Sequence, residues 1–215
     1  MSEGFLSRIQ GWFDAKYHGR YLGIILAEIG TRHPKVIDAL LSAGLQRKTG
    51  KVFKTQRIEA EWTFGTDTGD RRADLAIFDS LDESADPVVL FEIKYHDKPI
   101  PAQGVRPAQF VDYQAWRSKG KGRAVLVLSR EVLVHQGLCA MTWTEAARTL
   151  RPFMEQSDFV EALVNHLEFE GLAMQDINAK SLVGFLQRIL CSGKGVGQIA
   201  GNLEGPVQFG HMLNN

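Results

Sequence analysis

The sequence predicts an α/β domain in which a mixed sheet is flanked by helices. Three neighbouring segments between residues 58 and 94 have the apolar patterns of β-strands. An amphipathic segment around residues 107–116 then precedes a fourth apolar run at 124–128, and further amphipathic segments follow. The expected order is therefore helix, three strands, helix and strand, with helices towards the C-terminus.

Two helices are expected before the first strand. The segment 19–29 carries an apolar stripe with residues three and four apart, formed by Leu22, Ile25, Leu26 and Ile29. A shorter helix is expected after Pro34, and Gly44 is a typical residue for its end. The apolar side of this helix consists of Val36, Ala39, Leu40 and Ala43.

The pattern changes to a period of two at Ile58, from which apolar and polar residues alternate as far as Phe64. A turn-rich segment leads to a second strand at 73–78, and a loop leads to a third strand at 88–94. Three strands that follow one another in this way predict an antiparallel meander.

A helix is expected to begin near Pro107, because proline is tolerated in a first helical turn, and to continue through Trp116. The five consecutive apolar residues at 124–128 are typical of a strand that is covered on both faces. This strand–helix–strand step predicts a parallel pair joined by a right-handed crossover.

Three regions are predicted along the chain: a core domain at 1–135, a helical extension packed on it at 136–192, and a glycine-rich tail at 193–215. The extension contains a capping-box pattern, Thr142 to Glu145. Its two apolar stripes cannot bury their faces alone, so we expect them to pack on the core or on each other. These stripes are Val160, Leu163, Val164 and Leu167, then Leu182, Phe185, Leu186 and Ile189. Five glycines within 13 residues predict a flexible or loosely folded tail.

The composition is that of an ordinary globular protein, with 44% hydrophobic and 23% charged residues. The formal net charge of zero argues against a binder coated in basic residues, but it allows a local basic cleft. No apolar run has the roughly 18 residues of a transmembrane helix, and the first residues lack a secretion signal, so we expect a cytoplasmic protein without membrane contact. Cys139 and Cys191 have no CxxC spacing and are interpreted as buried, reduced thiols.

Glu92 and Lys94 are the first candidates for a functional site. They are two residues apart on a strand, so their side chains project from the same face, whereas Ile93 faces the other way together with Phe91 and Val89. Burying an unpaired charge is costly. The two charges must therefore be solvated, paired or bound to a cation.

Asp74 lies 18 positions before Glu92, at the start of the preceding strand. A hairpin can bring the two carboxylates together, and they repel each other unless a cation neutralises them. Hard oxygen ligands suit Mg²⁺ or Mn²⁺. The Lys94 ammonium could then stabilise charge on a phosphate and orient or help to deprotonate the attacking water. The alternative is a surface ion pair at a strand end, which leaves Asp74 and the order of the elements unexplained.

Ala73-Asp74 and Glu92-Ile93-Lys94 on successive strands resemble the motif of the PD-(D/E)XK nuclease superfamily. The resemblance covers roughly residues 19–130, and Ala73 stands where many members have proline. It implies a restriction-endonuclease-like αβββαβ core. It also implies a nuclease that depends on Mg²⁺ or Mn²⁺ and hydrolyses phosphodiester bonds in nucleic acid. We favour DNA as the substrate, and RNA is the alternative.

The resemblance adds further candidates around this motif. Glu28 matches an acidic residue that many members use as an additional metal contact, but it could equally pair with Arg20 or Arg32. Gln109 and Tyr113 match a glutamine-bearing helix, so Gln109 joins the catalytic candidates, Asp74, Glu92 and Lys94. Gln109 could also be a surface amide, and Tyr113 could belong to the core. The Ile93 carbonyl is a candidate metal ligand, because it lies between two residues that face the site.

Arg71, Arg72, Lys121 and Arg123 are candidates for nucleic-acid contacts, together with Tyr113, because a nuclease needs cations to hold a phosphate backbone. Runs of charge are also common in solvated loops. The second functional hypothesis is a catalytically inactive module with a nuclease fold that binds nucleic acid or a protein. Such a module would act within a larger assembly, for example in phage defence. A homodimer is a further possibility.

Overall fold

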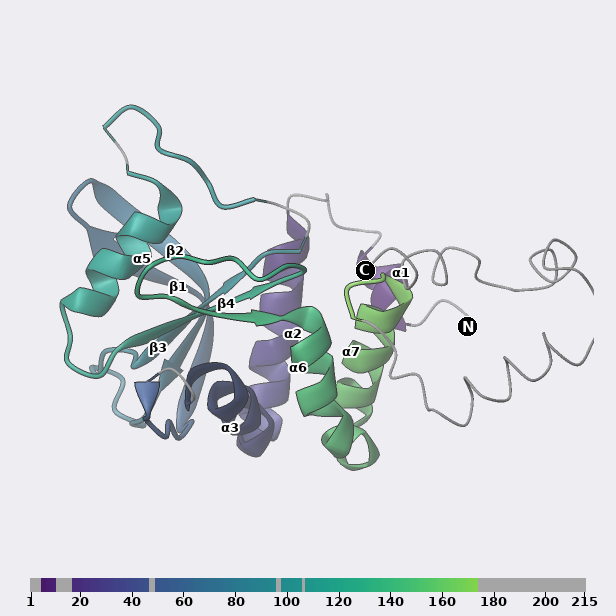
Figure 1. The fold of residues 1–215 in the computed structure, drawn as a ribbon. Helices are drawn as coiled ribbons and strands as arrows, with labels where there is room; N and C mark the ends of the chain where they lie inside the picture. The colour runs from purple at the N-terminus through teal and green to yellow at the C-terminus, as the bar shows by residue number, and fades with distance from the viewer. Residues whose placement is uncertain (1–4, 11–16, 47–48, 96–97, 106, 174–215) are drawn as a thin grey trace, which may run out of the picture. The chain divides into compact units, whose positions relative to one another are not determined.

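A five-stranded mixed sheet with the order β1-β2-β3-β4-β5 organises the fold (Figure 1). The computed structural model describes residues 5–10, 17–46, 49–95, 98–105 and 107–173. The chain divides into two units, Met1–Met174 and Gln175–Asn215, and all of the described residues belong to the first. The apolar stripe at 182–189, Cys191 and the glycine-rich tail lie outside the described residues.

The strands run as an antiparallel meander that continues into a parallel part. β1 (Arg57–Thr66), β2 (Gly69–Phe78) and β3 (Val89–Ile93) pair antiparallel in chain order. β4 (Ala124–Ser129) pairs parallel with β3, and β5 (Cys139–Thr142) pairs parallel with β4. The α/β class, the mixed sheet and the directions of the first four strands are confirmed.

The helices cover both faces of this sheet (Figure 1). The larger core lies on one face and the smaller core, beneath α5 (Gln109–Ser118), on the other. Before the sheet come the helices α1 (Phe5–Gln10), α2 (His18–Arg32) and α3 (Pro34–Leu41) and the π-helical turn η2 (Ser42–Gln46). After it come α6 (Trp143–Leu150), the 3₁₀ helix η3 (Arg151–Gln156) and α7 (Asp158–Phe169), and these helices contribute to the larger core.

The fifth strand, β5, is a difference from the sequence analysis, which assigned its residues to a helical extension. The strand has only four residues and leads directly into α6. The predicted capping box is present there, because the Thr142 side chain accepts from the Glu145 backbone and the Glu145 side chain accepts from the Thr142 backbone. The helices that follow β5 therefore pack on the sheet as a continuation of the core.

One position in the β1–β2 hairpin departs from regular strand geometry. Ala60 pairs with Leu75 and Trp62 with Ala73, so Glu61 and Asp74 face each other between two regular pairs. On β2, Ala73 belongs to the smaller core and Leu75 to the larger, although side chains two apart on a regular strand share a face.

Glu61 has a φ of 56°, a backbone conformation that costs a non-glycine residue about 1–2 kcal/mol. The change of face on β2 is therefore matched by an unusual backbone on β1 at the same level of the hairpin. Asp74 lies where regular alternation stops.

Within the described residues, no helix combines the length and the apolar character that a membrane span requires.

Candidate active site

Glu92 is the centre of a buried polar cluster on the α5 face of the sheet. Its carboxyl group is near the C-terminal end of β3, and the residue is only 3% exposed. Oε1 accepts hydrogen bonds from Gln109 Nε2 at 2.7 Å and from Lys94 Nζ at 2.8 Å. Oε2 accepts a hydrogen bond from the Tyr113 hydroxyl group. The carboxylate is thus held by three side chains at once.

Lys94 shares this face of the sheet, as the strand periodicity predicts. It is 4% exposed, and its backbone is fixed on both sides. Its N–H donates to the Leu128 carbonyl at 2.7 Å, and its own carbonyl accepts from Trp143 Nε1 at 3.2 Å. The side chains of Phe91 and Ile93 lie in the larger core on the opposite face.

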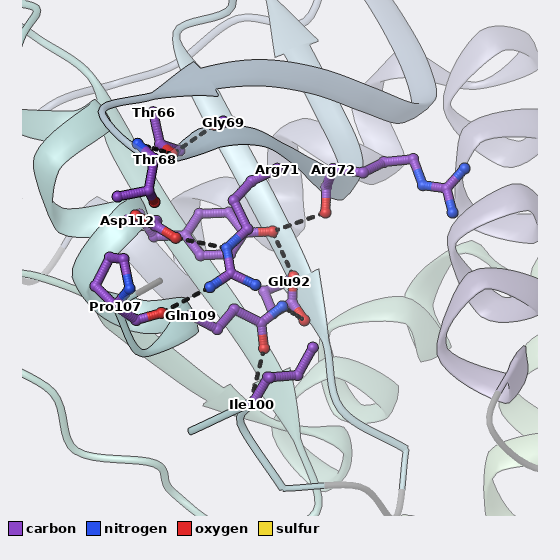
Figure 2. A network of polar contacts seen from close by, with 11 residues as sticks. Thr66, Thr68, Gly69, Arg71, Arg72, Glu92, Ile100, Pro107, Gln109 and Asp112 are labelled. Carbon is purple, nitrogen blue, oxygen red and sulfur yellow. Dashed lines mark hydrogen bonds and ion pairs between the residues drawn. The ribbon is translucent and has the colours of Figure 1, made fainter. Parts of the chain in front are cut away.

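Helix α5 supplies the groups that hold Glu92. Gln109 and Tyr113 are one helical turn apart, so both can reach the same carboxylate. Gln109 also exchanges contacts with Ile100: its side-chain oxygen accepts from the Ile100 N–H at 3.2 Å, and its own N–H donates to the Ile100 carbonyl at 2.9 Å (Figure 2). These contacts make Gln109 a positioning residue for Glu92.

Tyr113 is completely buried, which excludes the contact with nucleic acid expected for it from the sequence. Burial raises the pKa of its hydroxyl group well above the usual value of 10, and the negative charges of Glu92 and Asp74 raise it further. Its hydroxyl therefore stays protonated at neutral pH and remains a donor to Glu92. Tyr113 is a core residue and a positioning residue.

Asp74 lies at the point where β2 and β3 separate. The last backbone pair between these strands is Leu75 with Phe91, so Asp74 and Glu92 occupy the next position of the register. Asp74 Oδ2 accepts a hydrogen bond from the Ile93 N–H at 2.7 Å. The side chain of Asp74 thus bonds to the β3 backbone where the ladder between the strands has ended, and the two carboxylates come from adjacent strands at the same level.

Two glycines of α2 let this helix lie close to the backbone of the site. A Cβ atom on Gly19 would be 2.7 Å from the Ile93 carbonyl oxygen, and one on Gly23 would be 3.1 Å from the Asp74 carbonyl oxygen. A side chain at Gly19 would therefore collide with the carbonyl group that the sequence analysis proposes as a metal ligand.

The donor set around Asp74 is small. Among the described residues, no group of three or more His, Cys, Asp and Glu side chains converges as a metal site would require. Asp74, Glu92 and the Ile93 carbonyl group offer only oxygen atoms as donors. Mg²⁺ is commonly held by one or two carboxylates together with water and substrate phosphate, so the chemistry of this donor set suits such an ion.

Glu28 forms an ion pair with Arg32, which was the alternative to metal binding in the sequence analysis. Its carboxylate pairs with Arg32 Nε at 2.5 Å, four residues later on α2, and its side chain is 45% exposed. Five residues separate it from Gly23, which packs on Asp74, so it projects from another side of the helix. The structure does not group Glu28 with the other candidate ligands.

The proposed role of Arg71 in nucleic-acid binding is corrected by its burial. It is 8% exposed, its Nε donates to Asp112 Oδ2 at 2.5 Å, and one of its terminal nitrogens donates to the Pro107 carbonyl at 2.8 Å. Arg71 thus ties β2 to the start of α5 and is closed to a phosphate. Arg72 points in a different direction, away from this cluster (Figure 2).

Lys121 and Arg123 lie at the other end of the sheet from Glu92. They precede β4, which is parallel to β3, whereas Glu92 and Lys94 are at the end of β3. Both line an open hollow of about 620 Å³, whose other cationic side chains are Lys51 and Lys54. Arg123 is paired with Asp86 at 2.7 Å. The structure does not bring these two basic residues together with Asp74.

Two residues near Asp74 were missed by the sequence analysis, Arg20 and Glu61. Arg20 Nε lies 3.0 Å from Glu61 Oε1, and an Arg72 guanidinium nitrogen lies 3.6 Å from the same oxygen. The position of Glu61 could have been predicted from the turn at 67–68. A two-residue connection fixes the register of the hairpin and places Glu61 opposite Asp74. The contact with Arg20 is between distant segments, and no local pattern indicates it.

Comparisons with protein-family models, with curated proteins and with solved structures found no match to this chain.

Proposed function

We propose that this protein is a metal-dependent nuclease with a restriction-endonuclease-like core of the PD-(D/E)XK type. The observation that carries the proposal is the buried pair of Glu92 and Lys94, with the Asp74 carboxylate at the adjacent register position. These are the residues that resemble the motif, and Asp74 lies on the strand next to theirs, where the two strands separate. The alternative interpretation was a surface ion pair, which requires exposed side chains. Glu92 and Lys94 are buried.

Burial makes a purely stabilising role for this pair a poor explanation. Removing two charges from water is costly, and apolar residues of similar size often stabilise such a position equally well. Here the chain instead surrounds Glu92 with donors, Gln109 and Tyr113, that fix the orientation of its carboxyl group. Fixed charges of this kind are what a reaction through a charged transition state requires.

Each residue has a distinct role in this proposal. A bound Mg²⁺ or Mn²⁺ would polarise the phosphate and make water a better nucleophile at neutral pH. Asp74, Glu92 and the Ile93 carbonyl would hold the ion. Lys94, already 2.8 Å from Glu92, would stabilise negative charge on the phosphate and orient the attacking water. Gln109 and Tyr113 would keep Glu92 in place. We propose DNA as the substrate in preference to RNA.

Incubation of the purified protein with linear and circular DNA tests this proposal. Cleavage is expected with Mg²⁺ or Mn²⁺ and is expected to stop when EDTA is added, because the carboxylates alone provide no electrophile. RNA of the same sequence serves as a parallel substrate. Full cleavage in EDTA, or with Ca²⁺ as the only divalent ion, would contradict the metal mechanism.

A binding module without catalysis is the second candidate, and the completeness of the contacts around Glu92 favours it. Three side chains already hold this carboxylate, and the residue is 3% exposed. A comparison of wild type with Asp74→Ala separates the two functions. Lost cleavage with retained DNA binding supports the nuclease. Absence of cleavage by both proteins, with equal binding, supports the module.

A further inference from the structure

Glu61 joins two arginines from different elements beside Asp74. Its carboxylate lies within 3.0 Å of Arg20 on α2 and within 3.6 Å of Arg72 on β2. The backbone of Glu61 has the positive φ that strands avoid, and it faces Asp74 across the hairpin. An unusual backbone conformation in a strand is commonly kept where it has a function.

The charges of this group do not balance. Two guanidinium groups share one carboxylate, which leaves one positive charge uncompensated among these three side chains. The contacts are also loose: Glu61 Oε1 is inaccessible to solvent but accepts no hydrogen bond from any described residue. The N–H groups of Arg20 and Arg72 are therefore not directed at this oxygen, although the charges are close.

Both arginines are accessible from solvent. Their side chains are 40% and 42% exposed. The Arg20 guanidinium also lies over the Tyr17 ring, 5.3 Å from its centroid, which limits its movement. A guanidinium group presents its N–H donors in a planar fork that matches two oxygens of a phosphate. Two such forks beside one carboxylate offer donors to an anion with several oxygens.

The position of this group relates it to the candidate active site. Arg20 directly follows Gly19, which packs on the Ile93 carbonyl, and Arg72 is two residues before Asp74 on the same strand. Arg72 points away from the Glu92 cluster, so it lies beside the candidate reacting groups and not among them (Figure 2).

We propose that Arg20 and Arg72, held together by Glu61, bind a phosphate group of the nucleic-acid strand next to the phosphate that is cleaved. This inference rests on the proposed function. The contacts are to backbone phosphate, so the subsite does not depend on the base sequence. Glu61 is a positioning residue, because its negative charge keeps the two arginines close to each other and it does not itself contact the phosphate.

Binding measured without cleavage tests the subsite. The probe is a short fluorescent DNA duplex, titrated with protein in Ca²⁺ at several salt concentrations. The double variant Arg20→Gln/Arg72→Gln is expected to bind about 10-fold more weakly at low salt. The slope of log affinity against log salt is expected to fall by about 1, the value for one lost phosphate contact. The double variant Arg20→Lys/Arg72→Lys keeps the charges and is expected to retain most of the slope.

Lys35→Gln is the matched control, because it removes an exposed positive charge at the start of α3, beyond the opposite end of α2 from Arg20. Its affinity and salt slope are expected to equal those of wild type. The subsite is refuted if Lys35→Gln weakens binding as much as the double glutamine variant, if that variant binds like wild type, or if wild type does not bind DNA.

The same proteins separate this inference from the proposed function. If wild type fails to cleave but the arginine variants lose affinity as expected, the phosphate subsite stands and the nuclease proposal fails. If wild type cleaves and the double glutamine variant both binds and cleaves equally well, the nuclease proposal stands and the subsite fails.

Discussion

The two ends of the sheet use charged residues in different ways. At the C-terminal end of β3, Glu92 and Lys94 are buried and paired, and their contacts reach α5 and β4. At the N-terminal end of β3 and β4, Lys51, Lys54 and Lys121 line an open hollow. These three lysines are exposed. The charged side chains at the first end are fixed by several contacts.

The two ends therefore differ in how firmly each charge is held in place. A lysine in an exposed loop loses little interaction with water and keeps many rotamers, so it attracts anions without orienting them. A lysine that is 4% exposed and bonded to a carboxylate has a defined position. Orientation before the reaction is what lowers a barrier.

Loss of the buried carboxylate should have the largest effect on stability. Glu92→Ala leaves the Lys94 ammonium buried without its partner, and we expect the free energy of unfolding to fall by about 3–5 kcal/mol. Asp86→Ala breaks the pair with Arg123 at the other end, where the Asp86 side chain is 76% exposed, and should cost at most about 1 kcal/mol. Urea denaturation measures both. Equal losses would remove the contrast between the two ends.

A buried side chain without an ionic partner sharpens the comparison. His166 is 2% exposed, its Nδ1 is 2.9 Å from Ser7 Oγ, and its Nε2 has no hydrogen-bond partner within the described residues. Burial, and then the charge of His18, lowers its pKa from 6.5 to about 4. His166 is therefore buried in its neutral form.

Acid should destabilise the protein through this histidine. Between pH 6.5 and pH 4 the unfolded chain binds a proton on His166 that the folded protein does not, so the free energy of unfolding falls as the pH falls. The loss should approach about 3 kcal/mol near pH 4. His166→Asn should flatten this part of the profile, whereas His33→Asn, at a partly exposed histidine, should leave it unchanged. An unaltered slope in His166→Asn would contradict the assignment.

A smaller effect is expected from adding a side chain where α2 packs closely on the backbone of the candidate site. Gly19→Ala would place a Cβ atom 2.7 Å from the Ile93 carbonyl oxygen, and a backbone atom cannot move away cheaply. We expect a loss of about 1–3 kcal/mol, although alanine is the better helix former. Gly65→Ala has no atom within 4 Å of its added Cβ and should be neutral. Thermal denaturation distinguishes the two, and a stabilised Gly19→Ala would refute the close packing.

Strand periodicity and chain order were sufficient to predict which residues lie at the centre of the candidate site. The alternation of β3 put Glu92 and Lys94 on one face, and the meander brought Asp74 to the neighbouring strand. Both are local rules that hold without knowledge of the tertiary structure. The direction of the parallel pair also contained information that the sequence analysis did not use, because residues just before β4 must lie at the far end from Lys94.

The features that the sequence did not reveal depend on contacts between distant segments. Arg71 is buried against Asp112, which lies 41 positions later in the sequence. Because Arg71 is close to Asp74 in the sequence, the local pattern indicated a cation that is free to bind phosphate. Glu61 reads as the polar side of an alternating strand, but its positive φ and its contact with Arg20 arise only in the folded hairpin. The strand β5 is too short for its period to stand out beside the capping box of α6.

Separate roles for Asp74 and Lys94 are the central claim, and binding of Mn²⁺ measured together with DNA cleavage tests it most directly. Asp74→Asn should weaken Mn²⁺ binding, because it removes a charged oxygen ligand. Lys94→Met should bind Mn²⁺ as tightly as wild type or slightly more tightly, because an ammonium group offers no lone pair and its loss removes a positive charge beside Glu92. Cleavage by Lys94→Met should nevertheless fall by about 10²-fold or more, the effect of losing one group that stabilises the transition state. Equal loss of Mn²⁺ affinity in both variants, or full activity of Lys94→Met, would contradict these roles.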